Sequence, residues 1–201
     1  MTPVEILMQE HRVIEVVLEC LEKIAQNAEE NGRLDREPAE QALDLIRNFA
    51  DRCHHGKEEH RLFPAMVKRG IPDEGGPIGV MLIEHDMGRN HVRQMAECLD
   101  KAVSGDQAAV ETFTAGAFNF IELLSAHIQK EDRILFPMAD RVFSDDDQAK
   151  LIAEFNHVES AHMGEGTHEK YLKLVGELAA KYNISSSAID HASKGGCCHH
   201  H

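Results

Sequence analysis

The chain has 201 residues, of which 21 are Lys or Arg and 35 are Asp or Glu, so its formal net charge is −14 with neutral histidines. This acidic balance, with no basic stripe to offset it, disfavours a surface for nucleic acids or anionic membranes. Hydrophobic residues make up 42% of the chain and charged residues 28%, which is typical of a single globular helical domain.

Apolar residues recur at intervals of three and four over most of the chain, which predicts long amphipathic helices. We expect the first over about residues 2–28, before an Asn-Gly pair, and the second over about residues 38–69, with a kink at Pro64. A third is expected over about residues 78–103, and a fourth from the following Ser-Gly-Asp turn to about residue 142. The first part of the chain is therefore four long helices.

The remainder predicts two further helices and a tail. A Ser-Asp-Asp-Asp start predicts a fifth helix to about residue 162, and Thr167 can cap a sixth to about residue 182. Residues 183–201 hold too little apolar material to order themselves. We expect a bundle over residues 1–143, a helical extension packed on it over residues 144–182, and a flexible tail over residues 183–201.

The cysteines and the N-terminal residues indicate the cellular compartment of the protein. The five cysteines are odd in number and include no Cys-x-x-Cys, so neither a disulfide framework nor a zinc knuckle is indicated. The charged N-terminal stretch does not resemble a signal peptide, and no run approaches the ~18 apolar residues that span a membrane. We expect a cytoplasmic protein.

One motif occurs twice and organises the rest. Residues 53–64 and 127–137 each set a histidine four residues before a carboxylate and end in Leu-Phe-Pro. On an α-helix, residues four apart share a face, so each copy is half of a metal site. In the first copy His54/Glu58 and His55/Glu59 both fit this spacing. The His54 register continues an apolar stripe: Leu43, Ile46, Ala50, His54, Glu58, Leu62 and Ala65.

The second copy reads in the same way. His127 and Glu131 continue an apolar stripe, and Asp132 is a weaker alternative to Glu131. A Glu-His pair also occurs twice, once before each copy, at His11 and His85. The pairs are offset by 85 − 11 = 74 residues, close to the 127 − 54 = 73 between the motif copies. Each of the four long helices therefore points one or two polar side chains inward.

A lone histidine on an apolar face is more often a hydrogen-bonded core residue than a ligand. Six such groups at matching depths favour a metal, because two buried carboxylates without cations would cost several kcal/mol each or have to be neutralised. The six candidate metal ligands are His11, His54, Glu58, His85, His127 and Glu131.

These motifs resemble the hemerythrin-like, His-His-Glu cation-binding family. The resemblance covers about residues 2–142 and implies an all-α, up-down-up-down four-helix bundle around a non-haem di-iron centre, here with two additional C-terminal helices. It implies two Fe ions with an oxo or hydroxo bridge, with zinc or a mixed pair as alternatives. By the resemblance, Glu58 and Glu131 bridge the metals, His11 and His54 serve mainly one of them, and His85 and His127 mainly the other.

The chain departs from the oxygen carriers of that family. Those proteins place a second histidine four residues after that of the third helix, where this chain has Arg89. They also separate the last histidine and its carboxylate by five, a spacing that here only His127/Asp132 would meet. The chain is more similar to the di-iron proteins of stress response and iron–sulfur-centre repair.

Ligand counting leaves room for a small molecule. Two six-coordinate irons have about twelve ligand positions, of which the six residues and one bridging oxygen fill about ten. His157, His162 and His168 are candidates for an additional ligand, with His168 placed after a Gly-x-Gly turn that could return it to the bundle, although a surface role is favoured for all three. Gly88 and Arg89 would supply space and a donor beside an open position. We read His55, His60 and His91 as surface residues or residues behind the ligands.

Our leading hypothesis is a non-haem di-iron protein that binds or reduces a small ligand (O2, NO or peroxide) in stress response or iron-centre repair. The alternatives are a reversible O2 or NO carrier or sensor, and an iron- or zinc-handling protein without redox turnover. The expected partner is the small ligand, with no nucleic acid and no membrane, and the chain is expected to be a monomer or weak homodimer.

Overall fold

The structure is a computed structural model that describes residues 1–163, 167–187 and 189, without the side chains of residues 159–168. Every regular element in these residues is helical, and none is a strand. The all-helical class is therefore confirmed. The predicted tail falls largely on residues 188 and 190–201, which lie outside the described residues.

The first long helix, α1 (Pro3–Asn31), has both of its ends defined by the sequence. Thr2 accepts a hydrogen bond from the backbone N–H of Glu5, whose carboxylate accepts one from the backbone N–H of Thr2. This capping box satisfies two N–H groups that a helix start leaves free. At the other end Gly32 takes a left-handed conformation with φ 66°, which a glycine adopts without strain.

The second long helical segment includes two stretches of π-helix that the sequence did not predict. It consists of α2 (Arg36–Leu45), η1 (Ile46–His55), η2 (Glu58–Leu62) and α3 (Phe63–Lys68). Pro64 lies in the first turn of α3, where its ring would clash with the carbonyl four residues earlier in a regular α-helix. The carbonyl at that position, His60, accepts a hydrogen bond from Arg61 instead. The proline thus favours the wider turn before it.

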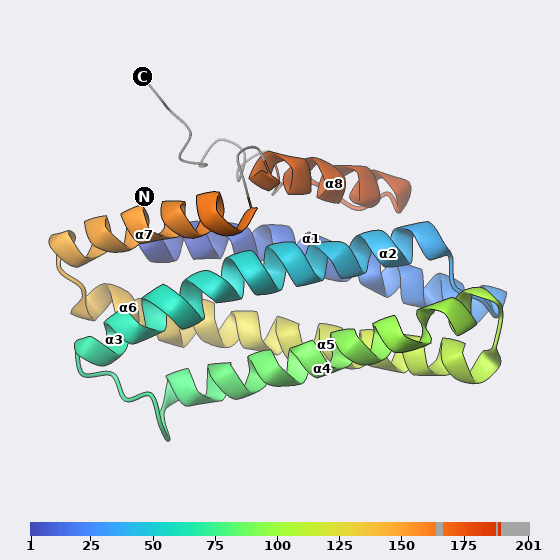
Figure 1. Ribbon diagram of the computed structural model, residues 1–201, viewed down its shortest axis with the longest axis horizontal. Helices are drawn as coiled ribbons and strands as arrows, with labels where there is room; N and C mark the ends of the chain where they lie inside the picture. Colours follow the sequence, from blue (N-terminus) through green and yellow to red (C-terminus); the bar gives the residue numbers. More distant parts are fainter. Residues whose placement is uncertain (164–166, 188, 190–201) are drawn as a thin grey trace.

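The other half of the bundle repeats this design. It consists of α4 (Pro77–Val103), α5 (Gln107–Lys130), η3 (Glu131–Leu135) and α6 (Phe136–Val142). Pro137 again lies in the first turn of the α-helix that follows a π-helical stretch. The four long helical segments lie side by side (Figure 1).

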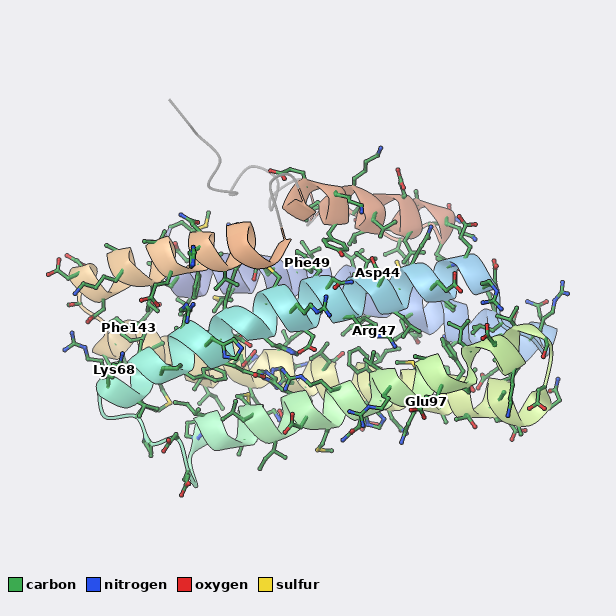
Figure 2. All side chains as sticks on the ribbon, viewed as in Figure 1. Asp44, Arg47, Phe49, Lys68, Glu97 and Phe143 are labelled. Carbon is green, nitrogen blue, oxygen red and sulfur yellow. The ribbon has the colours of Figure 1, made fainter. Side chains whose placement is uncertain are left out.

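Side chains fill the space between these segments (Figure 2). The buried apolar ones form two clusters. One surrounds Phe113 and Phe120, and the other surrounds Phe63 and Phe136. Along each long segment, buried polar residues lie between the members of the two clusters. The fold therefore encloses a polar layer between two apolar layers.

Two further helices cover the bundle. Helix α7 (Asp145–Met163) contributes Leu151 and Phe155 to the apolar cluster around Phe63. Helix α8 (Thr167–Lys181) contributes Val175 to the other apolar cluster. Helix α7 packs on α1, η1 and η2, and α8 packs on α1 and α2, so both lie on the side of the bundle formed by the first two long segments (Figure 1). Among the described residues, no helix combines the length and apolar character that a bilayer crossing needs.

Candidate metal centre

The buried polar layer consists of two clusters of imidazoles and carboxylates that share one residue. In each cluster, the offered ligand atoms all lie within 4.8 Å of one another, and all the residues are buried. One cluster comprises His11, His54, Glu58 and Glu131, and the other comprises His55, Glu58, His85 and His127. The structure thus brings together all six of the predicted ligands, and each cluster could hold a metal ion.

Glu58 and Glu131 each approach histidines of both clusters. The Glu58 Oε1 atom is 3.5 Å from His54 Nε2, and its Oε2 atom is 3.5 Å from His85 Nε2. The Glu131 Oε2 atom lies 3.2 Å from the Nε2 atoms of both His11 and His127. Each carboxylate therefore faces one histidine of each cluster, which is the arrangement that a bridging ligand needs.

Each imidazole of the two clusters is held from behind by a carboxylate. The Nδ1 partners are Asp132 for His11 at 2.7 Å, Glu10 for His54 at 2.9 Å, Asp51 for His55 at 3.4 Å, Glu59 for His85 at 2.7 Å and Glu84 for His127 at 2.9 Å. A carboxylate can only accept, so Nδ1 donates and Nε2 is left with its lone pair directed inward. This is how proteins usually orient and strengthen a metal-binding histidine.

Six of the atoms that point inward have no hydrogen-bond partner within the described part of the chain. They are His11 Nε2, His54 Nε2 and both carboxylate oxygens of Glu58 and of Glu131. The Nε2 atoms of His85 and His127 lie 3.1 Å apart, and with Nδ1 protonated on both rings only a shared proton or a cation relieves their repulsion. Buried polar atoms without partners are costly. The donor set of imidazole nitrogens and carboxylate oxygens suits iron or zinc.

The pKa values show how protons balance the charges when no cation does. Burial, with the neighbouring Glu131 charge, raises the pKa of Glu58 well above 4.5. Burial opposes ionisation of Glu131 too, but His127 and His11 outweigh it and lower its pKa. Burial likewise disfavours the charged form of His127, yet Glu131 and Glu84 raise its pKa to about 9. Metal binding at such a site would displace protons.

His55 was expected at the surface or behind the ligands. It is not a surface residue, because only 7% of its surface is exposed, and it lies in the second cluster. His54 and His55 are both buried, as are their repeat equivalents His127 and Ile128 in the α-helix α5, so the bundle encloses both neighbours at this position. The π-helix η1, whose hydrogen bonds span five residues instead of four, reduces the turn between His54 and His55 further.

The two Leu-Phe-Pro sequences also have a role that the sequence did not reveal. The Phe136 ring stacks on His11 with ring centroids 5.3 Å apart, and the Phe63 ring stacks on His85 at 6.1 Å. Each phenylalanine follows a π-helical stretch of one helix and covers a histidine of another. The phenylalanines therefore pack against the imidazole faces and keep water from them.

Arg89 and the other candidate histidines with described side chains do not belong to the two clusters. Arg89 forms ion pairs with Asp51 and Glu59, the partners of His55 and His85, and with Asp86. Its role is to hold two of the carboxylates that orient histidines. The side chains of His162 and His168 lie outside the described residues. The exposed histidines are His157 and His60, and His91 is half-buried.

The carboxylates behind the histidines are the functional residues that the sequence analysis did not assign. A local signal existed for four of them, because each lies next to a ligand. They are Glu10, Glu59, Glu84 and Asp132. Asp51, four residues before His55, had no such signal.

A helical bundle with a central layer of imidazoles, each backed by a carboxylate, defines a class of metal-binding protein. The family model described as the hemerythrin HHE cation binding domain matches residues 2–139. The chain belongs to this family.

Curated relatives agree with this assignment. The chain is 22% identical over 183 residues to uncharacterized proteins of Mycobacterium tuberculosis and Mycobacterium bovis, covering 91% of this chain and 71% of theirs. It is 38% identical over 92 residues to a protein of Yersinia pseudotuberculosis named iron-sulfur cluster repair protein YtfE. That match covers 44% of this chain and 41% of the relative. The predicted likeness to the iron–sulfur-repair type is confirmed.

Proposed function

We propose that this chain holds two iron ions between its four long helical segments and uses them to bind or reduce a small molecule. The observation that carries the proposal is the pair of clusters that share Glu58, with inward-facing nitrogens and oxygens that lack partners. The proposal includes an up-down-up-down bundle over residues 1–143 and a packed helical extension over residues 144–182.

The ligand assignment follows the distances. His11 and His54 hold one ion, His85 and His127 hold the other, and Glu58 and Glu131 bridge them. This set leaves open coordination positions for an external ligand.

Iron in such a site would supply one-electron redox chemistry and a binding position for O2, NO or peroxide. The chain's own residues do the rest. Carboxylates fix the tautomer and orientation of each imidazole, as Glu10 does for His54. Phe63 and Phe136 cover the faces of His85 and His11, which lowers the local dielectric and strengthens the electrostatic interactions within the layer.

A role in stress response or iron-centre repair is supported by the likeness to the relatives named iron-sulfur cluster repair protein. Reductive or detoxifying turnover is favoured over reversible carriage because the third helix has Arg89 where the oxygen carriers have a second histidine.

The test is a visible spectrum of the reduced, iron-loaded protein after exposure to O2, NO or hydrogen peroxide. Turnover predicts that the small molecule is consumed over many equivalents per chain. A stable adduct that reverses when the gas is removed would identify a carrier or sensor. Loss of iron to a weak chelator, with no spectral response to any of the three, would identify a metal-handling protein.

A further inference from the structure

The internal repeat predicts that the two metal positions have equivalent surroundings, yet one side differs. Counting the offset of 74 residues, Gly88 occupies in the second half the position that Ile14 has in the first half. Ile14 is buried with 2% exposure. A Cβ atom on Gly88 would come within 3.4 Å of Phe120 Cε2. The missing side chain therefore leaves space beside His85 that an isoleucine fills beside His11.

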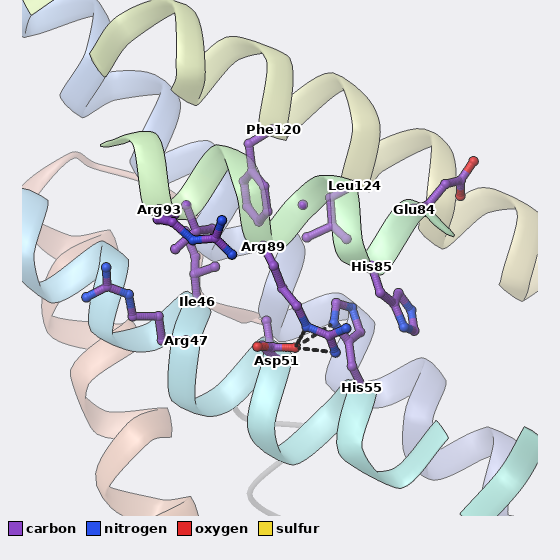
Figure 3. A pocket seen from close by; sticks show the side chains of 13 residues that line it. Ile46, Arg47, Asp51, His55, Glu84, His85, Arg89, Arg93, Phe120 and Leu124 are labelled. Atoms are coloured by element: carbon purple, nitrogen blue, oxygen red, sulfur yellow. Dashed lines mark hydrogen bonds and ion pairs between the residues drawn. The ribbon is translucent and has the colours of Figure 1, made fainter. Parts of the chain in front are cut away.

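A cavity of about 260 Å³ occupies this space. It lies between η1, α4 and α5, with Val92, Phe120 and Leu124 among its apolar lining residues. His55 and His85 line it as well (Figure 3). None of the cavity's lining residues is a ligand on the His11 and His54 side. It therefore leads to only one of the two proposed metal positions.

His55 forms the inner wall of the cavity. Its ring stacks on His85 with centroids 3.8 Å apart and planes 14° apart. An ion bound in the ring plane of His85 would lie about 3.5 Å, the contact distance of stacked rings, from the plane of His55. That is far longer than a metal–imidazole bond of about 2.1 Å. In this rotamer His55 would therefore lie beside an ion bound by His85 without binding it.

The repeat supports the same reading. The residue equivalent to His55 in the second half, at an offset of 73, is Ile128. Ile128 is buried with 2% exposure and carries no ligand atom. The position is thus one that packs beside the metal layer in both halves, with a polar ring in only one of them.

Three arginines line part of the cavity, together with the acids Asp51 and Glu84. The charge of Arg89 is balanced by its ion pairs with Asp51, Glu59 and Asp86. Asp51 pairs with Arg89 at 2.8 Å (Figure 3), and Glu84 pairs with Lys130. The other two arginines, Arg47 and Arg93, form no ion pair within the described part of the chain. In a chain of net charge −14, this is a local site of attraction for an anion.

We propose that this cavity is the binding and access site for a small inorganic anion, which it delivers to the metal position of His85 and His127. Arg47 and Arg93 attract the anion, Gly88 provides its space, and His55 is the wall it meets beside the metal. This inference rests on the proposed two-metal site and goes beyond it, because it assigns an anionic ligand in addition to the neutral O2, NO and peroxide, and the metal position that this anion reaches.

The test uses azide as the probe on the iron-loaded full chain, with iron content measured first. Gly88→Leu is expected to keep the wild-type iron content and to bind azide at least ~10-fold more weakly, since a filled cavity excludes the probe. Arg47→Gln with Arg93→Gln is expected to slow azide association severalfold at low salt and to flatten its salt dependence. Arg33→Gln is the control, because Arg33 is exposed and does not line the cavity. It should change neither the azide affinity nor the azide association rate.

Three results would overturn the inference. One is a Gly88→Leu variant with full iron and unchanged azide affinity, with Gly88→Ala as the milder replacement if the leucine variant does not fold. Another is an azide association rate that neither the arginine substitutions nor salt alters, together with a Gly88→Leu variant that no longer binds NO. The cavity would then serve a neutral ligand. The third is loss of one iron per chain in His55→Phe, which would make His55 a ligand. A wild-type chain that holds no iron would instead refute the proposed function, before any azide is added.

Discussion

The two lysines of the repeat offer a matched test of how the layer of histidines is held. Lys57 is fully buried and pairs with Glu10, the carboxylate that accepts the Nδ1–H of His54. The equivalent Lys130 pairs with Glu84, but 37% of its side chain is exposed. The same chain of contacts is therefore buried in one half of the molecule and partly hydrated in the other.

The cost of removing each lysine follows from this difference. Burial opposes the charge on Glu10, but Lys57 and His54 outweigh it and lower its pKa from 4.5 to about 2, which corresponds to about 3 kcal/mol. Breaking a buried pair by removing one partner costs about 3–5 kcal/mol. We therefore expect Lys57→Met to lower the free energy of unfolding by about 3 kcal/mol, and Lys130→Met by less than about 1 kcal/mol because its pair is exposed.

The assay is urea unfolding of the chelator-treated protein at neutral pH and again in acid. Because the folded pKa of Glu10 lies below its ordinary value, its stabilisation is present above pH 4.5 and is lost as the pH falls towards about 2. Lys57→Met should therefore lose less stability than the wild type in that window. Equal costs for the two lysines at neutral pH would refute the reasoning.

Three other outcomes are expected. Asp132→Asn should weaken metal binding about 10–100-fold by removing the acceptor behind His11, whereas Asp100→Asn, at an exposed residue that pairs with Arg36, should leave it unchanged in the same equilibrium dialysis. Metal loading at pH 7 should release protons, because His127, with a pKa of about 9, is protonated there until a metal displaces its proton; a pH indicator that records no release would contradict this. Chelation should lower the melting temperature, since a metal present at 100 times its Kd adds about 2.7 kcal/mol, and an unchanged melting curve would contradict metal binding in the folded state.

The helices, and the residues of each helix that face inward, could be predicted from the sequence because both depend on residues close together in the chain. An apolar stripe at intervals of three and four has to be buried, and it continues through His54 and Glu58 but not through the solvated face that leads to Glu59. The structure buries His54 and Glu58 accordingly and leaves Glu59 half-buried, as the partner of His85. Helix ends followed from a glycine and capping residues in the same way.

The position of His55 could not be read in this way. The stripe was counted with the turn of an α-helix, whereas residues 46–55 form a π-helix. A π-helix is rare, and its presence depends on how the whole segment accommodates Pro64 and packs against its neighbours. The periodicity of the segment does not predict the π-helix. The burial of His55 also depends on how the neighbouring helices pack, since the equivalent Ile128 is buried in an α-helix.

Which imidazole each carboxylate meets was also beyond a local reading. Asp132 accepts from His11, 121 residues away in sequence, and Glu10 accepts from His54, 44 residues away. These contacts depend on which helices lie side by side and at what height. The repeat in the sequence indicated that the helices correspond, but not which acid would meet which imidazole.

The most direct test of the central claim is the amount of iron bound per chain by the wild type and by Glu58→Ala, measured by metal analysis together with the visible spectrum. Glu58 is the residue shared by both clusters. We expect two irons per chain in the wild type and loss of the two-metal centre in the variant. A variant that still binds two irons with an unchanged spectrum would contradict the bridged two-metal site.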